Sequence, residues 1–535
     1  MRISVNKALM SLGKKARDSI CKELVGLHNI KFWRPIRYNS LSTKQKKKKM
    51  IRSFMLLKEK YNSEGDFDKL KSRLVAGGNM QDRSEYTEAE TSSPTVSLSS
   101  VYMVAAIAAK ENRKVGTADV GMAFLNSKLE REVIMNLEPR LASILVEELP
   151  SYLDFVNDDG SLTMVLQQAL YGLVESSKLW YDTLTGFLKS LGFEPNPKDV
   201  CIFNREYKRN QLTLALYVDD MLATCSDEAG IEWIFEQLRK KFKDVTTTRG
   251  SKHSFLGQTF DFGVEGECSV TMEGYIADLL EMRSTTKTAS TPALEDLFIV
   301  DESSDPLSDE LSTIFHSVSA KAYYLALRVR PDILTSAAFL VTRVKRPTVQ
   351  DEAKLDRMLA YLNATQEMGI RLAGDGIGPM TVTAYVDASY GVHWDFKSHT
   401  GCMISVTKGP VHVSSRKQGL TTKSSTEAEL VGVSDAMTQV IWTREFLLAQ
   451  GYNLGPAVVK QDNQSTMVLA NKGRSTSSKT RHIGIRYFWV NDRIVSGDVV
   501  LEYLATEDMA ADILTKPLQG ILFRKMRTLL LNSRT

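Results

Sequence analysis

Cysteine is scarce in this sequence, and its five copies are widely separated. Zinc sites and disulfide scaffolds use cysteines that are grouped at short spacings. No two of these cysteines form a Cys-x-x-Cys pair, so the sequence argues against both kinds of site and favours a reducing compartment. The five are Cys21, Cys201, Cys225, Cys268 and Cys402.

Long apolar runs are also missing. No run approaches the roughly 20 residues that a membrane-spanning helix needs, and the first seven residues do not lead into the apolar core of a signal peptide. We therefore expect no membrane partner.

The chain has little excess of one charge, since 68 Lys and Arg against 64 Asp and Glu give a net charge of +4. That excess permits a basic nucleic-acid channel but does not argue for one, because affinity depends on local clustering.

The chain is too long for a single hydrophobic core, because 535 residues correspond to three or four domains. Its 43% hydrophobic and 25% charged residues are ordinary globular values.

Apolar periodicity predicts a β-hairpin over residues 54–81. A shift to Thr, Pro, Asp, Glu and Ser over residues 290–310 predicts a boundary. The same periodicity predicts helices over residues 5–27, 97–110, 313–328, 332–344 and 349–365, a long helix from Thr426, and helices near Gln464 and Lys479.

Residues 212–224 place two adjacent carboxylates, Asp219 and Asp220, between two short apolar runs. Strand-forming residues on both sides of a polar pair predict a β-hairpin with the two aspartates at its tip. Asp is also a favoured turn residue without any chemical role. The pair alone therefore leaves a catalytic and a structural interpretation open.

A third carboxylate, Asp119, ends an apolar segment upstream, and Phe124 follows it. Carboxylates from separate strands can hold a pair of Mg²⁺ ions, because Mg²⁺ prefers hard oxygen ligands and leaves positions for water and phosphates. Two such ions stabilise the attacking and leaving oxygens of a phosphoryl transfer. Asp119, Asp219 and Asp220 are therefore candidate metal ligands.

Two groups of motifs carry a resemblance to a known family. The segments 119–125, 170–173 and 217–220 resemble the reverse transcriptase of copia-type LTR retrotransposon polyproteins. Later segments resemble the RNase H domain that follows the polymerase in those polyproteins, and the order covers the chain from about residue 20 to about 520. These later segments are 385–388, 424–429, 462–465, 481–487 and 511–517.

The resemblance implies an α/β (α+β) chain. It implies a right-hand polymerase with fingers, a ferredoxin-like palm and a helical thumb and connection, followed by an RNase H-like mixed α/β domain. The corresponding domain limits are an N-terminal extension at 1–53, fingers and palm at 54–290, thumb and connection at 291–375, the RNase H-like domain at 376–520, and a C-terminal tail at 521–535.

The resemblance also implies an RNA-directed DNA polymerase with RNase H activity. Asp119, Asp219 and Asp220 would bind two Mg²⁺ ions, with Mn²⁺ as a substitute. The expected partners are an RNA or DNA primer-template, an RNA–DNA hybrid and deoxynucleoside triphosphates, whereas the oligomeric state stays open. Reverse transcription in this family takes place in cytoplasmic virus-like particles, and its product goes to the nucleus.

Five residues are candidates for nucleotide binding by the same resemblance. Lys71 and Arg73 would clamp the triphosphate, although a surface strand with alternating charges would look the same. Phe124 would exclude a 2′-hydroxyl sterically, or would be an ordinary core aromatic. Tyr217 precedes the aspartate pair. Glu175 replaces the Gln of the commonest family pattern, and its carboxylate would repel a triphosphate unless a cation intervenes.

The resemblance assigns a second metal-binding set to Asp387, Glu429, Asp462 and Asp512, with Glu427 as the rival of Glu429. This set would use two metal ions to hydrolyse the RNA strand of the hybrid. His482 lies in a familiar family context but has no assigned chemical role.

Each of these acidic residues also has a structural interpretation. Asp387 would be a turn residue at a strand end, and Asp512 an ordinary surface residue. Thr426 and Glu429 would form a capping box, in which the Glu reaches back to the helix N-terminus. Asp462 would cap the next helix. The coincidence of all four with the family pattern favours the metal-binding interpretation.

Basic residues give two further expectations with structural alternatives. The run at 44–49 is a solvated linker, or a phosphate or nuclear-import contact. The basic residues between 328 and 346 keep helices soluble, or grip duplex phosphates without reading sequence. These basic residues are Arg328, Arg330, Arg343, Lys345 and Arg346.

The rival function for the whole chain is a non-catalytic remnant or a domesticated nucleic-acid-binding protein derived from such an element.

Overall fold

The computed structural model describes residues 5–47, 50–61, 67–283, 285–373, 378–472 and 484–534. The chain forms two compact units. Within the described ranges, no helix is both long and apolar enough to cross a membrane. The first unit contains residues 1–95, 119–193 and 238–246, and the second contains 96–118, 194–237 and 247–535.

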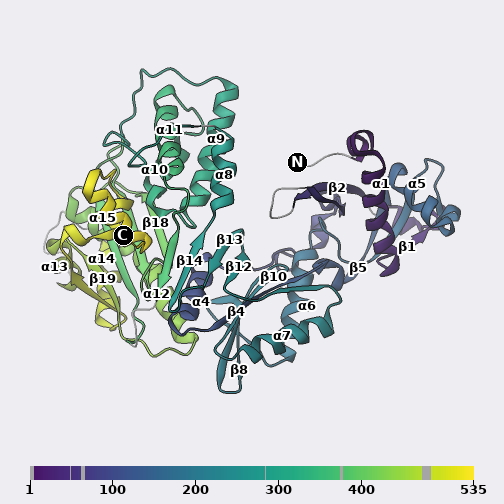
Figure 1. Cartoon of the computed structure of the whole chain (residues 1–535), viewed down its shortest axis with the longest axis horizontal. Coiled ribbons are helices and arrows are strands. Elements are labelled where there is room, and N and C mark those ends of the chain that lie inside the picture. Colours follow the sequence, from purple (N-terminus) through teal and green to yellow (C-terminus); the bar gives the residue numbers. More distant parts are fainter. Residues whose placement is uncertain are drawn as a thin grey trace. The chain divides into compact units, whose positions relative to one another are not determined.

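A five-stranded sheet with the order β1-β6-β5-β2-β3 forms the first unit (Figure 1). Helix α1 (Val5–Asn29) packs on β2, β3 and α5 (Pro139–Glu148). Its buried residues recur at steps of about four, which is the spacing of one helix face. This confirms the expected helix over residues 5–27. The strands are β1 (Trp33–Ile36), β2 (Ile51–Tyr61), β3 (Phe67–Ala76), β5 (Lys128–Leu137) and β6 (Leu162–Gln168).

Strands β2 and β3 pair antiparallel, which confirms the hairpin expected over residues 54–81. Along β3 the side chains alternate between the two faces of the strand, as pleated strands require. Leu74 and Ala76 are buried in the core, whereas Lys71 and Arg73 are exposed on the opposite face. The other helices of this unit are α2 (Thr43–Lys47), α3 (Glu88–Thr91) and α6 (Ser176–Ser190).

The second unit contains most of a sheet with the order β11-β4-β10-β9-β8-β7, to which it contributes residues 114–118 of β4 and 247–248 of β11. Helix α4 (Leu98–Lys110) is buried along most of its length and packs on β9 and β10. Helix α7 is Glu228–Lys241. The strands are β4 (Lys114–Val120), β7 (Glu194–Asn196), β8 (Asp199–Tyr207), β9 (Asn210–Tyr217), β10 (Asp220–Cys225) and β11 (Val245–Thr248).

A four-stranded sheet and a helical group follow. The sheet has the order β12-β13-β14-β15, and its last strand comes after the helices in sequence. The helices confirm the three that periodicity predicts between residues 313 and 365, with ends that shift by up to four residues. The elements are β12 (Lys252–Phe255), β13 (Gln258–Asp261), β14 (Glu267–Thr271), α8 (Glu273–Glu281), α9 (Asp309–Ala326), α10 (Leu334–Arg343), α11 (Val349–Asn363) and β15 (Ile370–Ala373).

A buried ion pair anchors this helical group. Arg330 and Asp332 are fully buried and form two hydrogen bonds of 2.9 and 2.8 Å. The Tyr361 hydroxyl of α11 donates to the same Asp332 carboxylate at 2.6 Å. Arg330 is therefore a structural residue rather than a surface cation for phosphate binding, which corrects that part of the expectation.

The last sheet has the order β18-β17-β16-β19-β20. Strands β16, β17 and β18 pair antiparallel, whereas β19 pairs parallel with β16 and β20 parallel with β19. Helix α12 packs across β16 and β17. Lys479, near which a helix is expected, and His482 lie outside the described residues. The elements are β16 (Thr383–Ser389), β17 (His399–Ser405), β18 (His412–Lys417), α12 (Ser425–Ala449), β19 (Ala457–Gln461), α13 (Gln464–Lys472), α14 (Gly484–Val495), β20 (Val499–Tyr503) and α15 (Gly520–Leu531).

Candidate functional site

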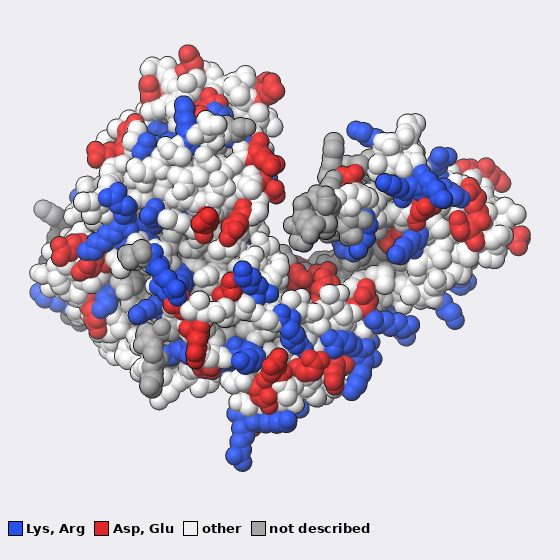
Figure 2. Space-filling view, in the orientation of Figure 1, with Lys and Arg blue, Asp and Glu red and all other residues white. Residues whose placement is uncertain are grey.

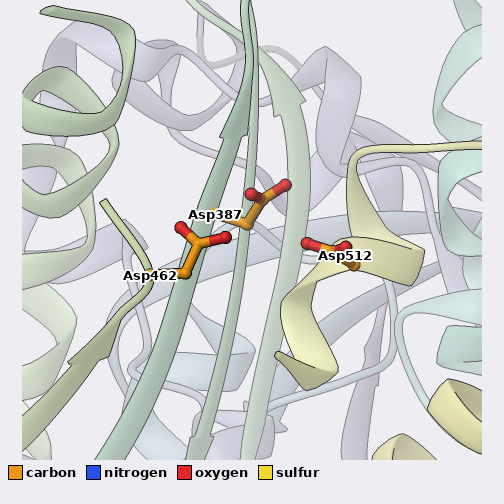
Figure 3. A group of neighbouring side chains, drawn as sticks. All are labelled: Asp387, Asp462 and Asp512. Atoms are coloured by element: carbon orange, nitrogen blue, oxygen red, sulfur yellow. The ribbon is translucent and has the colours of Figure 1, made fainter. Parts of the chain in front are cut away.

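Three aspartates of the second unit come together from three separate elements. Asp387 lies on β16, Asp462 directly follows β19, and Asp512 lies on the short 3₁₀ helix η9 (Ala510–Leu514). One carboxylate oxygen from each residue lies within 4.8 Å of the others. Figure 3 shows the three carboxylates directed toward the same space. Asp387 and Asp512 are only 1% and 3% exposed, so their charges are largely shielded from water.

Glu429 approaches the same group from helix α12. Glu429 is 6% exposed, and its carboxylate accepts a hydrogen bond from Gln461 Nε2 at 3.3 Å. Burial, together with the charges of Asp387 and Asp462, raises the pKa of Glu429 to about 9. Burial and the charge of Asp387 raise the pKa of Asp512 to about 7. The structure therefore brings all four predicted acidic residues into one electrostatically strained centre, which we call the acidic centre.

A lysine also takes part in the acidic centre. The Lys516 ammonium lies 2.9 Å from Asp512 Oδ1 and 3.3 Å from Asp387 Oδ1. The Thr515 hydroxyl donates a hydrogen bond to the other Asp387 oxygen, Oδ2. Burial lowers the pKa of Lys516, but the two aspartates outweigh it and raise that pKa overall. Sequence reasoning missed both residues, although Lys516 stands four positions after Asp512, a spacing at which side chains meet.

The donor set of the acidic centre fits a hard divalent cation. Every candidate ligand atom is a carboxylate oxygen, which Mg²⁺ prefers over nitrogen or sulfur. Burial and the neighbouring carboxylates raise the pKa values of Glu429 and Asp512, although Lys516 offsets part of this effect at Asp512. The residues present therefore match a site for Mg²⁺ or Mn²⁺.

The capping of helix α12 separates Glu427 from Glu429. The N-cap is Ser424, whose hydroxyl accepts from the Glu427 backbone N–H at 3.2 Å. Glu427 in turn accepts from the Lys423 backbone N–H at 2.8 Å. The capping box expected for Thr426 and Glu429 is therefore wrong, because the helix begins earlier. Glu427 serves the helix end, whereas Glu429 lies near enough to Asp387 and Asp462 for their charges to raise its pKa.

The other structural interpretations also fail against the geometry. Asp387 lies within β16 rather than in a turn, and Asp512 is buried rather than on the surface. Asn463, not Asp462, caps α13, because its side chain accepts from the Thr466 backbone N–H at 3.0 Å. The acidic residues of this centre are thus not accounted for by turns or helix caps.

In the first unit, two glycine-containing segments meet backbone to backbone. The Ala76 N–H donates to the Tyr171 carbonyl at 2.7 Å. A Cβ atom on Gly172 would lie 2.2 Å from the Ala76 carbonyl oxygen, and one on Gly78 would lie 1.9 Å from the Gly172 carbonyl oxygen. Gly172 also has a φ of 95°, which side chains rarely tolerate. The close approach therefore requires glycine at both positions.

Next to this contact, the Tyr171 ring lies between two residues that are candidates for nucleotide binding, Arg73 and Phe124. The Arg73 guanidinium lies over the Tyr171 ring, 5.0 Å from its centroid. The Phe124 ring meets the same tyrosine edge to face at 4.8 Å between centroids. Arg73 is exposed and Phe124 is half-buried. The structure thus connects Arg73 with Phe124 through Tyr171, while Lys71 lies two residues away on the same face of β3.

Glu175 is held in a hydrogen-bond network. It is 5% exposed and accepts from Gln81 Nε2 at 2.9 Å and from the Tyr86 hydroxyl at 3.1 Å. Gln81 Oε1 accepts from the Val174 backbone N–H at 2.9 Å, which fixes the orientation of its amide. Burial and the Glu175 charge raise the pKa of Tyr86 to about 12. Both carboxylate oxygens of Glu175 are thus engaged by neighbouring donors.

The hairpin of β9 and β10 carries the adjacent aspartates of the second unit. Tyr217 pairs with Asp220, so the turn consists of Val218 and Asp219, and Asp220 is the first residue of β10 rather than part of the tip. Val218 has a φ of 56°. Such a conformation is a genuine outlier for a β-branched residue, and strain of this kind concentrates at functional sites. Tyr217 is 38% exposed.

Asp119 stands out within its own strand. It is exposed near the end of β4, whereas the four residues before it are buried. Residues 114–118 of β4 and the strand β10 are neighbours in one sheet. Asp119 itself falls in the first compact unit and the Asp219–Asp220 pair in the second.

Charged side chains are mixed on the visible face. Figure 2 shows Lys and Arg interspersed with Asp and Glu. This agrees with the small net charge of +4.

The chain is similar to known proteins over much of its length. Residues 38–294 match the family described as reverse transcriptase (RNA-dependent DNA polymerase). The Retrovirus-related Pol polyprotein from transposon RE1 of Arabidopsis thaliana is 30% identical over 471 residues, which cover 87% of this chain and 30% of that protein. The corresponding polyprotein from transposon TNT 1-94 of Nicotiana tabacum is 27% identical over 485 residues, which cover 88% and 35%. The chain thus spans about a third of the length of these relatives.

A solved structure shows the same fold. The foamy viral protease-reverse transcriptase in complex with double-stranded DNA has a TM-score of 0.53 at 11% identity, covering 92% of this chain and 70% of that one. This likeness confirms the expected fold class, a mixed α/β chain with a right-hand polymerase fold.

Proposed function

This chain belongs to the copia-type retrotransposon Pol polyproteins and contains their reverse transcriptase region, and from that premise we propose that it is an RNA-directed DNA polymerase with a second, ribonuclease H centre. The observation that carries the nuclease half is the meeting of Asp387, Asp462 and Asp512 within 4.8 Å. The polymerase half is supported by the family match and by the strained Val218 turn beside Asp219. Bound Mg²⁺ ions would stabilise the attacking and leaving oxygens of the reacting phosphate.

In the proposed nuclease centre, the chain supplies ligands and holds them in place. Asp387, Asp462 and Asp512 would bind the ions, and Glu429 would complete the set from α12. The Thr515 hydroxyl orients the Asp387 carboxylate through its hydrogen bond to Oδ2. Because these groups come from a sheet and the elements packed on it, little reorganisation is needed before an RNA strand is cut.

In the proposed polymerase centre, Asp119, Asp219 and Asp220 would hold the ions that bind the incoming triphosphate. Arg73 and Lys71 would contact its phosphates from the exposed face of β3, where cations offset the charge of the transferring group. Phe124 and Tyr217 would lie against the nucleotide. Phe124 would then exclude a 2′-hydroxyl, which selects deoxynucleotides.

The role we propose for Glu175 is positional. Its carboxylate oxygens receive hydrogen bonds from Gln81 and Tyr86, so we propose that they hold the local structure rather than face a triphosphate. It would thereby fix the residues around Val174, next to Tyr171 and Gly172. The expected substrates are a primer-template, an RNA–DNA hybrid and deoxynucleoside triphosphates, and the expected location is a cytoplasmic particle whose product enters the nucleus.

The nuclease half can be tested with an end-labelled RNA annealed to DNA. The purified chain should cut the RNA in Mg²⁺, and Asp387→Asn should abolish cutting. Asp508→Asn is the matched control, because Asp508 pairs with Lys525 at the surface, at 2.9 Å, outside the acidic centre. Equal cutting by Asp387→Asn and wild type would refute the assignment of this centre.

A further inference from the structure

We propose that Lys516 is a displaceable counter-cation of the acidic centre, whose ammonium occupies part of the metal site until a divalent ion binds and thereby limits metal affinity. The inference rests on the proposed nuclease function, because it concerns the same four carboxylates. It predicts that loss of the lysine strengthens metal binding, which a purely structural role would not do.

The position of the ammonium carries the argument. It bridges Asp512 Oδ1 at 2.9 Å and Asp387 Oδ1 at 3.3 Å. Asp387 and Asp512 are also two of the three residues whose oxygens lie close enough to share an ion. The lysine therefore neutralises the two aspartates where an ion would bind.

A divalent ion and the ammonium cannot comfortably share these oxygens. Mg²⁺ binds oxygen at about 2.1 Å, so an ion on Asp512 Oδ1 would lie at most about 5 Å from the Lys516 ammonium, which is 2.9 Å from that atom. At such a separation in a shielded site, like charges repel strongly. Binding of the ion should therefore expel the ammonium.

The lysine side chain is able to leave while its backbone stays. The Lys516 backbone N–H donates to the Asp512 carbonyl at 2.9 Å, which holds this residue at the end of η9. Its side chain is 37% exposed, and a four-carbon stem can swing the ammonium into solvent. Thr515 meanwhile keeps its hydrogen bond to Asp387 Oδ2. The neighbouring residues thus divide their tasks, since Thr515 orients Asp387 and Lys516 exchanges with the ion.

The experiment measures Mn²⁺ binding to the full chain by electron paramagnetic resonance. All proteins carry Asp219→Asn and Asp220→Asn, so that ions at the proposed polymerase centre do not obscure the result. Lys516→Met should lower the Mn²⁺ dissociation constant by about fivefold or more, as expected for a coupling between two sites. Lys516→Arg, which keeps the charge, should bind like the parent. Lys525→Met is the matched control, because it removes a lysine–aspartate pair outside the centre.

Melting temperatures give a second readout. Without metal, Lys516→Met should melt below the parent, because the carboxylates lose their internal cation, and Mn²⁺ should close or reverse this gap. Lys516→Gln is the alternative neutral variant if the methionine protein does not fold.

The outcomes separate the inference from the function on which it rests. Unchanged or weaker Mn²⁺ binding in both neutral variants, with binding lost in Asp387→Asn, overturns the role of Lys516 but leaves the metal centre intact. If the parent binds no Mn²⁺, or if its Mn²⁺ binding is unaffected by Asp387→Asn, both the role of Lys516 and the metal centre are overturned.

Discussion

The backbone N–H of Ala76 donates a 2.7 Å hydrogen bond to the carbonyl oxygen of Tyr171 and thereby joins strand β3 to the segment that precedes helix α6. Through this bond the exposed Arg73 reaches the Tyr171 ring, which also contacts Phe124. Three residues from distant parts of the sequence therefore form one surface in the first unit. The proposed nucleotide contacts depend on this junction.

Replacement of Gly172 by alanine should disrupt the junction. The added Cβ would lie 2.2 Å from the Ala76 carbonyl oxygen, at a φ of 95°. We expect the free energy of unfolding of the first unit to fall by about 1–3 kcal/mol and nucleotide incorporation to drop with it. Urea unfolding and primer extension measure the two effects.

Gly186→Ala is the control for this change. Among the described residues, no atom outside the backbone of helix α6 and the adjoining residues lies within 4 Å of a Cβ placed at Gly186. Alanine there should stabilise the helix by about 0.5–1 kcal/mol. Equal stability of the two alanine variants would contradict the role given to Gly172.

Glu175→Gln should not improve nucleotide binding. Glu175 is 5% exposed, and its carboxylate receives hydrogen bonds from Gln81 and Tyr86. A glutamine would replace one acceptor oxygen by a donor, so we expect a loss of about 1 kcal/mol in unfolding free energy. The KM for deoxynucleotides, from steady-state primer extension, should stay within about twofold. A KM that falls several-fold would show instead that the carboxylate repels the triphosphate.

Phe124→Val should relax the choice of sugar. Valine removes the ring that is proposed to collide with a 2′-hydroxyl, while it keeps an apolar side chain beside Tyr171. Incorporation of ribonucleotides relative to deoxynucleotides should rise by roughly tenfold or more, which corresponds to about 1.4 kcal/mol. Single-nucleotide extension with each substrate measures the ratio. An unchanged ratio would assign Phe124 to the core alone.

The buried histidine pair of the last sheet predicts a loss of stability in acid. His393 Nε2 lies 2.9 Å from His399 Nδ1, and both rings are buried. Burial lowers the pKa of His393 to about 4 and that of His399 to about 3. The unfolded chain binds protons near pH 6.5, so unfolding free energy should fall as the pH drops from 6.5 toward 4, by up to about 1.4 kcal/mol per histidine per pH unit.

Urea unfolding between pH 7 and 4.5 checks this dependence. Charged groups near the pair are Lys417, which disfavours the protonated His393, and Asp395, which favours it. His399→Gln should flatten the slope, whereas the exposed His316→Gln should leave it unchanged. Identical slopes in all three proteins would contradict the prediction.

Local patterns allowed much of the fold to be predicted from the sequence. Helix α1 could be predicted because its apolar residues repeat with the helical period, and the β9–β10 hairpin could be predicted because apolar runs flank Asp219. The exact ends of helices were harder to predict. Ser424 and Thr426 both suit an N-cap, and only the backbone shows that Ser424 is used.

Relationships between distant residues could not be predicted from local patterns. Lys516 and Asp387 are 129 positions apart and meet only because η9 packs on β16 and β17. The network of Glu175 with Gln81 and Tyr86 likewise requires the folded first unit. The positive φ of Val218 opposes the preference of its residue type, so propensity would have given the wrong conformation.

One substrate tests the central claim that this chain contains a polymerase and a separate nuclease. An end-labelled poly(A) template with an oligo(dT) primer reports primer extension and RNA cleavage in the same Mg²⁺ reaction. We predict that the Asp219→Asn, Asp220→Asn double variant loses extension but still cleaves, and that Asp387→Asn loses cleavage but still extends. If the folded wild-type chain binds this substrate yet neither extends nor cleaves in Mg²⁺ or Mn²⁺, the account is contradicted and the chain is a nucleic-acid-binding remnant.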